Sequence, residues 1–303
     1  MNDDRHSLFR DAHSDRSSAE QVPDTPQTRA PAYRLAFDDA DFLLRDELRP
    51  VRLQLELLKP EMILNERGIQ STVVLFGGAR IPEPSRRETA CTPELANLSR
   101  YYDEAREFSR LMTEKSMSTY GREYVIATGG GPGVMEAGNR GAADAGGASI
   151  GFNIVLPHEQ APNEYVTPGL CFNFHYFAIR KMHFLMRARA ICVFPGGFGT
   201  LDETFEALTL IQTDRMARVP FLLFGKDFWR RIINWEALAE AARSAKGIST
   251  SSALSRRRTR RSRSSRTGAR RPGPEAAGHR AMRRLSCLPA CVAPRKAELS
   301  PKS

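Results

Sequence analysis

A glycine-rich turn joins an apolar run to a helical pattern near residue 195. The run 190–194 has the length and composition of a buried strand, and the segment from Leu201 to Gln212 has the pattern of a helix. Between them lies Pro195-Gly196-Gly197-Phe198-Gly199-Thr200. A strand that enters a helix through such a turn directs unpaired backbone N–H groups, and the positive end of the helix dipole, at one small volume. The sequence therefore predicts an anion site at this turn.

Two residues at the start of this helix allow two interpretations. Thr200 can donate its hydroxyl to a phosphate, and Glu203, one turn further on, can face the same ligand. The same pair, three residues apart, also matches a capping box, in which both side chains satisfy the helix N-terminus and bind no ligand. The local pattern alone leaves both interpretations open.

Two further strand-like runs end in glycines. Residues 124–128 lead into Gly129-Gly130-Gly131-Pro132-Gly133, and residues 72–76 lead into Gly77-Gly78. Consecutive glycines cost backbone entropy, so they indicate a place where the backbone must approach a ligand closely. Three such strand ends predict one site at the carboxyl edge of a parallel sheet. None has the G-x-G-x-x-G spacing with an acidic residue about 20 positions on, so we expect a mononucleotide site and disfavour a dinucleotide oxidoreductase.

The rest of the central region alternates strands and helices. This alternation predicts an α/β fold, a Rossmann-like doubly wound parallel sheet with helices on both faces. The expected strands are 72–76, 124–128, 148–155, 190–194 and 220–224. The expected helices are 92–118, 134–145, 177–189, 201–213 and 227–241.

The two ends of the chain differ from this central region in composition. Residues 1–36 are polar and predicted to be disordered, and residues 37–242 are predicted to form the catalytic domain with a helical lead-in. That lead-in, Asp38–Leu58, has an apolar face that can cover the sheet or pair with a second subunit, and Pro50 predicts two helices that meet there.

The last segment, residues 243–303, accounts for the net positive charge of the chain. It holds 17 Lys or Arg and two acids, a net of +15, whereas the whole chain carries +10. Rich in Arg and Ser and without apolar periodicity, it is predicted to be disordered. Two interpretations stay open, a basic arm for nucleic acid or an acidic surface, and the product of a shifted reading frame, which we favour. Apart from this tail, we expect no nucleic-acid partner.

Composition also restricts the compartment. The five cysteines are odd in number and lack C-x-x-C spacing, which favours reduced thiols in a cytoplasmic protein. No apolar stretch approaches the roughly 20 residues of a membrane span, so we expect no membrane partner. The histidines lack a ligand spacing, and we expect neither a metal nor a cofactor.

Three motifs together resemble those of the LOG family of Rossmann-like proteins, long labelled lysine decarboxylases. They are residues 129–137, the pair Arg180-Lys181, and Pro195–Glu203, in this order, and the resemblance spans roughly residues 37–241. It implies an enzyme that hydrolyses the N-glycosidic bond of a nucleoside 5′-monophosphate, of the AMP or cytokinin riboside type, to free base and ribose 5-phosphate. It also implies a homodimer.

The resemblance further assigns the site residues. The catalytic pair maps to Arg180 and Glu203, and Glu203 can stabilise an oxocarbenium-like sugar or position water. The implied substrate-binding residues are Gly130, Gly131, Gly133, Met135, Lys181, Gly196, Gly197, Gly199, Thr200 and Thr209. In short members of the family a His stands two residues before the catalytic Arg, where this chain has Ala178, so the preference for a cytokinin base is in doubt.

Several alternatives remain at this level. Lys181 can be a second anion ligand, which the resemblance favours, or a solvated helix cation. Glu136 can contact a ribose hydroxyl or stabilise its own helix N-terminus. At the level of function, the alternative to a hydrolase is a non-catalytic nucleotide-binding or sensing module, with a tail that contacts nucleic acid. Such a module keeps the glycine loops but does not depend on Glu203.

Overall fold

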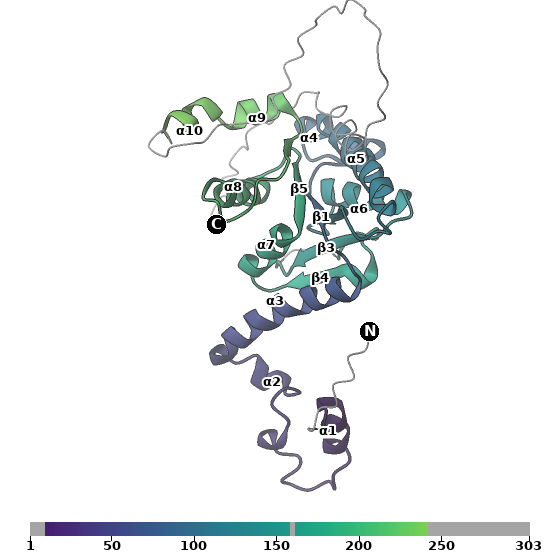
Figure 1. Ribbon diagram of the computed structural model, residues 1–303, viewed down its shortest axis with the longest axis vertical. Helices are drawn as coiled ribbons and strands as arrows, with labels where there is room; N and C mark the ends of the chain where they lie inside the picture. The colour runs from purple at the N-terminus through teal and green to yellow at the C-terminus, as the bar shows by residue number, and fades with distance from the viewer. Residues whose placement is uncertain (1–9, 158–160, 242–303) are drawn as a thin grey trace, which may run out of the picture. The chain divides into compact units, whose positions relative to one another are not determined.

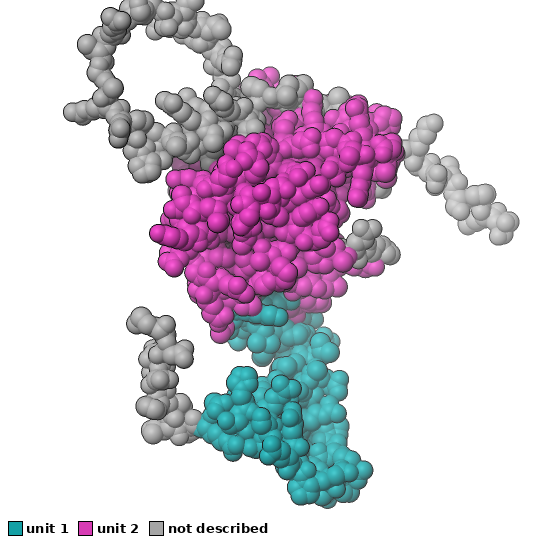
Figure 2. Space-filling view, turned by 90° about the vertical axis from the view of Figure 1, so that its right-hand side faces the viewer, with its two compact units in different colours: residues 1–59 teal, residues 60–303 magenta. Residues whose placement is uncertain are grey.

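The computed structural model describes residues 10–157 and 161–241 of the chain. The chain consists of two compact units, residues 1–59 and 60–303, coloured teal and magenta in Figure 2. The boundary lies inside helix α3 (Arg49–Glu66), where the buried side chains are Pro60 and Leu64. No α3 side chain before Pro60 is buried. The predicted domain division after residue 36 stays a prediction.

The first unit contains short helices. They are α1 (Ala12–Ala19), η1 (Pro31–Tyr33), α2 (Ala40–Leu43), η2 (Asp46–Leu48) and the beginning of α3. Helix α1 corrects the expectation of disorder for that stretch, since the Asp11 carboxylate caps it by accepting a hydrogen bond from the Ser14 amide. Helix α3 begins one residue before Pro50, which confirms the prediction that two helices meet there.

The second unit is built on a six-stranded sheet in which all neighbouring strands are parallel, in the order β4-β3-β2-β1-β5-β6. The strands are β1 (Thr72–Phe76), β2 (Val125–Thr128), β3 (Ser149–Ile154), β4 (Cys171–Phe174), β5 (Ala188–Val193) and β6 (Phe221–Leu223). The chain adds strands to one side of β1 as far as β4 and then crosses to the other side. The strand order therefore reverses at β1, and ligands bind at such a reversal in open α/β sheets.

Helices cover both faces of this sheet (Figure 1), which confirms the predicted Rossmann-like class. Helices α5 (Arg100–Met117) and α6 (Val134–Asp144) supply one apolar core. Helices α7 (Phe177–Met186), α8 (Phe198–Gln212) and α9 (Lys226–Ile232) supply the other. The remaining short elements are η3 (Pro84–Thr89), α4 (Pro93–Asn97), η4 (Pro168–Leu170) and α10 (Trp235–Ala241).

Some predicted boundaries need correction. Strand β4 was not among the expected strands, and the helix expected over 177–189 ends at Met186 because Ala188 already belongs to β5. The helix expected to start at Leu201 starts at Phe198. Among the described residues, no helix has both the length and the apolar character that crossing a membrane requires. The basic tail and its reading-frame hypothesis lie outside the described residues.

Candidate functional site

The glycine loops that follow β1, β2 and β5 meet at the carboxyl edge of the sheet. The Gly78 amide donates to the Pro195 carbonyl at 2.9 Å, and the Val134 amide donates to the Gly78 carbonyl at 3.3 Å. A Cβ added at Gly133 would stand 2.4 Å from that same Gly78 oxygen. Only glycine permits this approach, so the structure brings the three loops into one cluster.

Two helices begin at this cluster without a side-chain cap. The N-cap of α6 is Gly133 and that of α8 is Gly197, and neither helix start has a side-chain hydrogen bond to its cap. Apart from Val134, whose amide donates to the Gly78 carbonyl, the first-turn amides therefore lack a capping side chain, and both positive dipole ends are available to an anion. Because α8 begins at Phe198, Thr200 is its third residue and not its cap. The capping-box interpretation of Thr200 and Glu203 is therefore wrong.

Arg180 links the strand ends to α8. It is buried, with 8% of its surface exposed. Its Nε donates to the Phe152 carbonyl at 2.7 Å, and its Nη1 lies 3.6 Å from Glu203 Oε1. Its Nη2 lies against Gly129, since a Cβ added there would be 2.7 Å away. The guanidinium thus contacts both the loop after β2 and the carboxylate on α8.

Glu203 has an unusual protonation equilibrium. Burial raises the pKa of its carboxyl to about 7, and the positive charge of Arg180 opposes this rise without cancelling it. At neutral pH both protonation states are then populated. A carboxyl group with this property, beside a buried guanidinium at a helix start, is a candidate acid or base.

Lys181 occupies a position that neither predicted interpretation describes. Its Nζ lies 2.7 Å from Asp202 Oδ2 and 3.1 Å from Glu206 Oε2, both on α8. Although burial lowers the pKa of Lys181, hydrogen bonds to these two carboxylates raise it above its ordinary value. Lys181 therefore joins α7 to α8 beside the Arg180–Glu203 pair, and does not point at an anion.

The other predicted residues fall into two groups. Gly130, Gly131 and Gly133 are buried in the loop after β2, where the Met135 side chain lies against Gly129 and Gly131. Gly196 is half-buried, with the Thr200 hydroxyl against it, and Gly197 and Gly199 are exposed. Thr209 is exposed two turns beyond Glu203, and its hydroxyl donates to the Phe205 carbonyl at 2.7 Å. The structure does not place Thr209 with the Arg180–Glu203 pair.

Sequence reasoning missed a polar network beneath the loop after β2. Thr128, Asn139 and Asn163 are connected to one another and to the loop by hydrogen bonds of 2.7–3.0 Å. The available signal was a run of buried apolar residues that ends in Thr128, and an Asn inside an apolar helix. Glu136, in turn, is held by Tyr102, whose hydroxyl donates to Oε1 at 2.6 Å.

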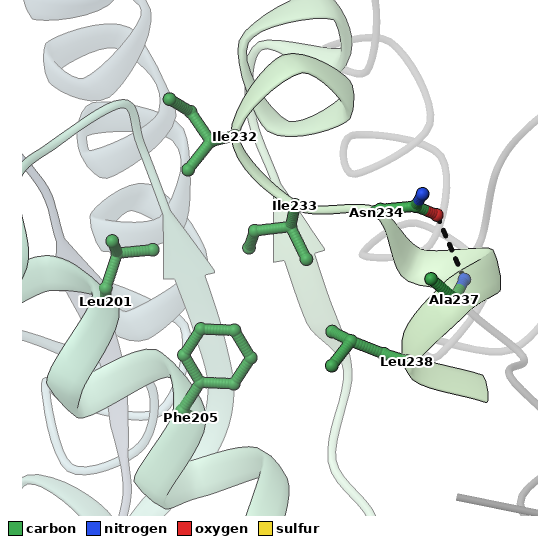
Figure 3. Close-up of a pocket in the computed structure, with 7 residues that line it drawn as sticks. All are labelled: Leu201, Phe205, Ile232, Ile233, Asn234, Ala237 and Leu238. Carbon is green, nitrogen blue, oxygen red and sulfur yellow. Dashed lines mark hydrogen bonds between the residues drawn. The ribbon is translucent and has the colours of Figure 1, made fainter. Parts of the chain in front are cut away.

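An apolar groove lies on another side of α8 (Figure 3). Its volume is about 410 Å³, and its lining comprises Leu201, Phe205, Ile232, Ile233, Asn234, Ala237 and Leu238. The one amide side chain among them is engaged, since Asn234 Oδ1 accepts from the Ala237 amide at 2.9 Å. Leu201 and Phe205 are each two residues, or about 200° of helix rotation, from Glu203. The groove is thus separate from the glycine loops.

Comparisons with known proteins give one family and several structural likenesses. The profile of the family described as "possible lysine decarboxylase" matches residues 135–256. The X-ray structure of TM1055, a structural genomics target, is 27% identical over 46% of this chain and 69% of its own, with a TM-score of 0.35. A search of the curated proteins finds no match.

Two other similar structures bear names of molybdenum cofactor proteins. The cofactor-binding protein of the phototrophic bacterium Rippkaea orientalis is 19% identical over 57% of this chain and 84% of its own, with a TM-score of 0.37. The carrier protein of Chlamydomonas reinhardtii is 20% identical over 54% of this chain and 84% of its own, with a TM-score of 0.35. At these scores the likenesses carry no weight for function.

Proposed function

Because this chain belongs to the LOG family, whose description reads possible lysine decarboxylase, we propose that it hydrolyses the N-glycosidic bond of a nucleoside 5′-monophosphate. The products are the free base and ribose 5-phosphate. The observation that carries the proposal is the half-buried Glu203, which is paired with Arg180 in the second turn of an uncapped helix beside three glycine loops. A phosphate at the helix starts and a carboxylate nearby suit the two ends of a ribose 5-phosphate unit.

The proposed reaction divides the work between these groups. The amides at the starts of α6 and α8 hold the phosphate, so that binding energy away from the reacting bond orients the sugar. As the bond between C1′ and the base nitrogen breaks, positive charge develops on the sugar, and ionised Glu203 stabilises it. A water oxygen then bonds to C1′, and the proton released from that water balances the charge on the departing base.

Arg180 supports this chemistry as a permanent cation. A guanidinium does not lose its proton at neutral pH, so Arg180 acts as a hydrogen-bond donor and a charge, not as a base. Its position against Gly129 and beside Glu203 suits a group that contacts the substrate and keeps a fraction of Glu203 ionised. Its bond to the Phe152 carbonyl fixes the guanidinium in that place.

The decarboxylase of the family description finds less support. Such chemistry commonly uses a lysine that forms a Schiff base with pyridoxal phosphate. Lys181, the lysine beside the site, is held by Asp202 and Glu206, and their hydrogen bonds favour its protonated form. A protonated, doubly paired ammonium is a poor nucleophile.

The test is the release of free base from AMP, GMP, CMP and isopentenyladenosine monophosphate, with the matching nucleosides beside them. We expect cleavage of monophosphates only, and a loss of about 10²–10⁴-fold in kcat for Glu203→Gln. Glu206→Gln is the matched control, because Glu206 lies on the same helix but pairs with Lys181. Activity of the unaltered protein should rise with pH through about 7, since ionised Glu203 is the active form.

Two results would contradict the proposal. One is equal activity of Glu203→Gln and Glu206→Gln. The other is binding of AMP without cleavage of any monophosphate, which would favour the nucleotide-binding module instead.

A further inference from the structure

Asn163 binds the outer side of the loop after β2. Its side-chain Nδ2 donates to the Gly130 carbonyl at 2.9 Å and to the Gly131 carbonyl at 3.0 Å. Its backbone amide also donates to the Gly130 carbonyl, at 2.9 Å. The segment that contains Asn163 follows β3, so these contacts join two parts of the chain more than 30 residues apart. One side chain thus holds both carbonyls at the centre of the loop.

The direction of these carbonyls determines the direction of an amide. In a trans peptide the carbonyl and the following N–H point to opposite sides. Because the Gly130 carbonyl faces Asn163, the Gly131 N–H faces away from it. Within residues 10–157 and 161–241, neither the Gly131 nor the Gly133 amide donates a hydrogen bond. Donors oriented in this way, next to an uncapped helix start, form an anion-binding concavity.

The orientation of the Asn163 amide is itself fixed by its surroundings. The two glycine carbonyls can only accept, so the Nδ2 atom must face them. On the other side, Asn163 Oδ1 accepts from the Tyr165 amide at 3.2 Å. The same Nδ2 lies 3.0 Å from Asn139 Oδ1, which also accepts from Thr128 Oγ1 at 2.7 Å. The Thr128 hydroxyl oxygen accepts from the Gly130 amide at 3.0 Å.

We propose that Asn163 is a positioning residue of the anion site, which keeps the Gly130 and Gly131 carbonyls turned away from a phosphate ester. The peptide between two glycines can rotate easily, and Gly130 already has a φ of +73°. Without Asn163 this peptide turns over, and a carbonyl oxygen then faces the anion in place of the Gly131 N–H. The inference rests on the proposed function for the identity of the ligand as a 5′-phosphate.

The experiment compares Asn163→Asp with Tyr165→Leu. Asp has the shape of Asn but its ionised oxygens cannot donate to a carbonyl. Tyr165 lies in the same segment, with Arg140 over its ring at 5.3 Å, whereas the side-chain hydrogen bonds that the described residues make to the Gly130 and Gly131 carbonyls come from Asn163. Titration calorimetry with ribose 5-phosphate and with AMP should show affinity reduced about 10–100-fold in Asn163→Asp, and within about 3-fold of the unaltered protein in Tyr165→Leu.

Two more readouts separate positioning from general damage. We expect Asn163→Asp to raise KM for AMP more than it lowers kcat, and to abolish the shift of the Gly131 amide resonance that inorganic phosphate causes in the unaltered protein. Thermal unfolding verifies that each variant is folded. If Asn163→Asp does not fold, Asn163→Ala, which removes the donor without adding charge, replaces it in the same measurements.

The results also distinguish this inference from the proposed hydrolysis. Affinity for ribose 5-phosphate within 2-fold of the unaltered protein in a folded Asn163 variant would overturn the inference, whether or not the protein cleaves nucleotides. If the unaltered protein binds ribose 5-phosphate but cleaves no monophosphate, the proposed hydrolysis is wrong. The ratio of ribose 5-phosphate affinities between the unaltered protein and the Asn163 variant then still tests the role of Asn163. If it binds no phosphate compound, both proposals fail.

Discussion

The loop after β2 and the loop after β5 are both rich in glycine, yet they are built in opposite ways. In the first, Gly129, Gly130 and Gly131 are buried. Asn163, in the segment after β3, donates to two of its carbonyls, and Thr128 of β2 accepts from one of its amides. In the second, Gly197, Phe198 and Gly199 are exposed and already belong to the cap and first turn of α8.

The difference indicates a division of labour at one site. A braced loop keeps its amides in place before a ligand arrives, and such preorganised donors cost little reorganisation when charge appears. The open loop starts the helix that carries Glu203, the group with the shifted pKa. In this interpretation the first loop supplies a rigid binding surface for the phosphate, and the second loop leaves the side of the site that carries Glu203 accessible.

The largest expected effect is on stability, when the two loops receive the same substitution. Gly133→Ala places a methyl group 2.4 Å from the Gly78 oxygen at a φ of +70°, which should cost about 2–5 kcal/mol of the free energy of unfolding. Gly199→Ala has no atom within 4 Å of the new carbon and lies in a helix, so it should be neutral or stabilising by about 0.5–1 kcal/mol. Urea unfolding of both variants measures the contrast. Equal losses would mean that the two loops are equally constrained.

The second prediction concerns the half-buried carboxyl group of Glu203 on the open side. The pKa of Glu203 rises from 4.5 to about 7 on folding. Below pH 4.5 the carboxyl group is protonated in both the folded and the unfolded state, so it does not lower the free energy of unfolding. Between pH 4.5 and 7 the unfolded chain loses this proton while the folded protein keeps it, and stability falls by about 1.4 kcal/mol per pH unit. Above pH 7 the penalty is constant. Glu203→Gln lacks this titration.

The measurement is therefore a difference between two pH values. Relative to the unaltered protein, Glu203→Gln should be more stable at pH 8 than at pH 4.5 by up to about 3 kcal/mol. The attraction between ionised Glu203 and Arg180 is already included in the pKa of about 7, so it needs no separate correction. Glu206→Gln, on the same helix, is the control. A difference that does not change with pH would show that Glu203 is ionised throughout.

The sequence allowed the central part of the fold to be predicted. Strands β1, β2 and β5 contain the uninterrupted apolar runs 73–76, 125–127 and 190–193, each followed within a few residues by glycines, and a buried parallel strand has this pattern. Strand β4 has only four residues at the edge of the sheet, and its alternation, with Phe172 buried and Asn173 exposed, is too short to distinguish from a loop. The start of α8 was placed three residues late because Gly-Phe-Gly has low helix propensity.

In the site, residues that belong to motifs could be predicted from the sequence, whereas contacts between distant segments could not. Arg180 and Glu203 were expected from motifs, and the structure places them together. The role of Lys181 could not be predicted, because its partners Asp202 and Glu206 come from another helix. Asn163 lies more than 30 residues from the carbonyls it binds, so no local pattern indicates its role.

The smallest expected effect is at Phe198, the large apolar residue of the open loop. Its side chain is 92% exposed, whereas Met135 lies against the glycines of the braced loop. Substitution of an exposed side chain without a specific structural role usually changes the free energy of unfolding by no more than about 0.5 kcal/mol. Phe198→Ser should therefore leave it almost unchanged. Urea unfolding at low protein concentration measures this, with Phe184→Ser, a substitution at a buried ring near Arg180, as the disruptive counterpart. A loss of more than about 1 kcal/mol in Phe198→Ser would mean that this ring is packed, and the contrast between an open and a braced loop would then no longer hold.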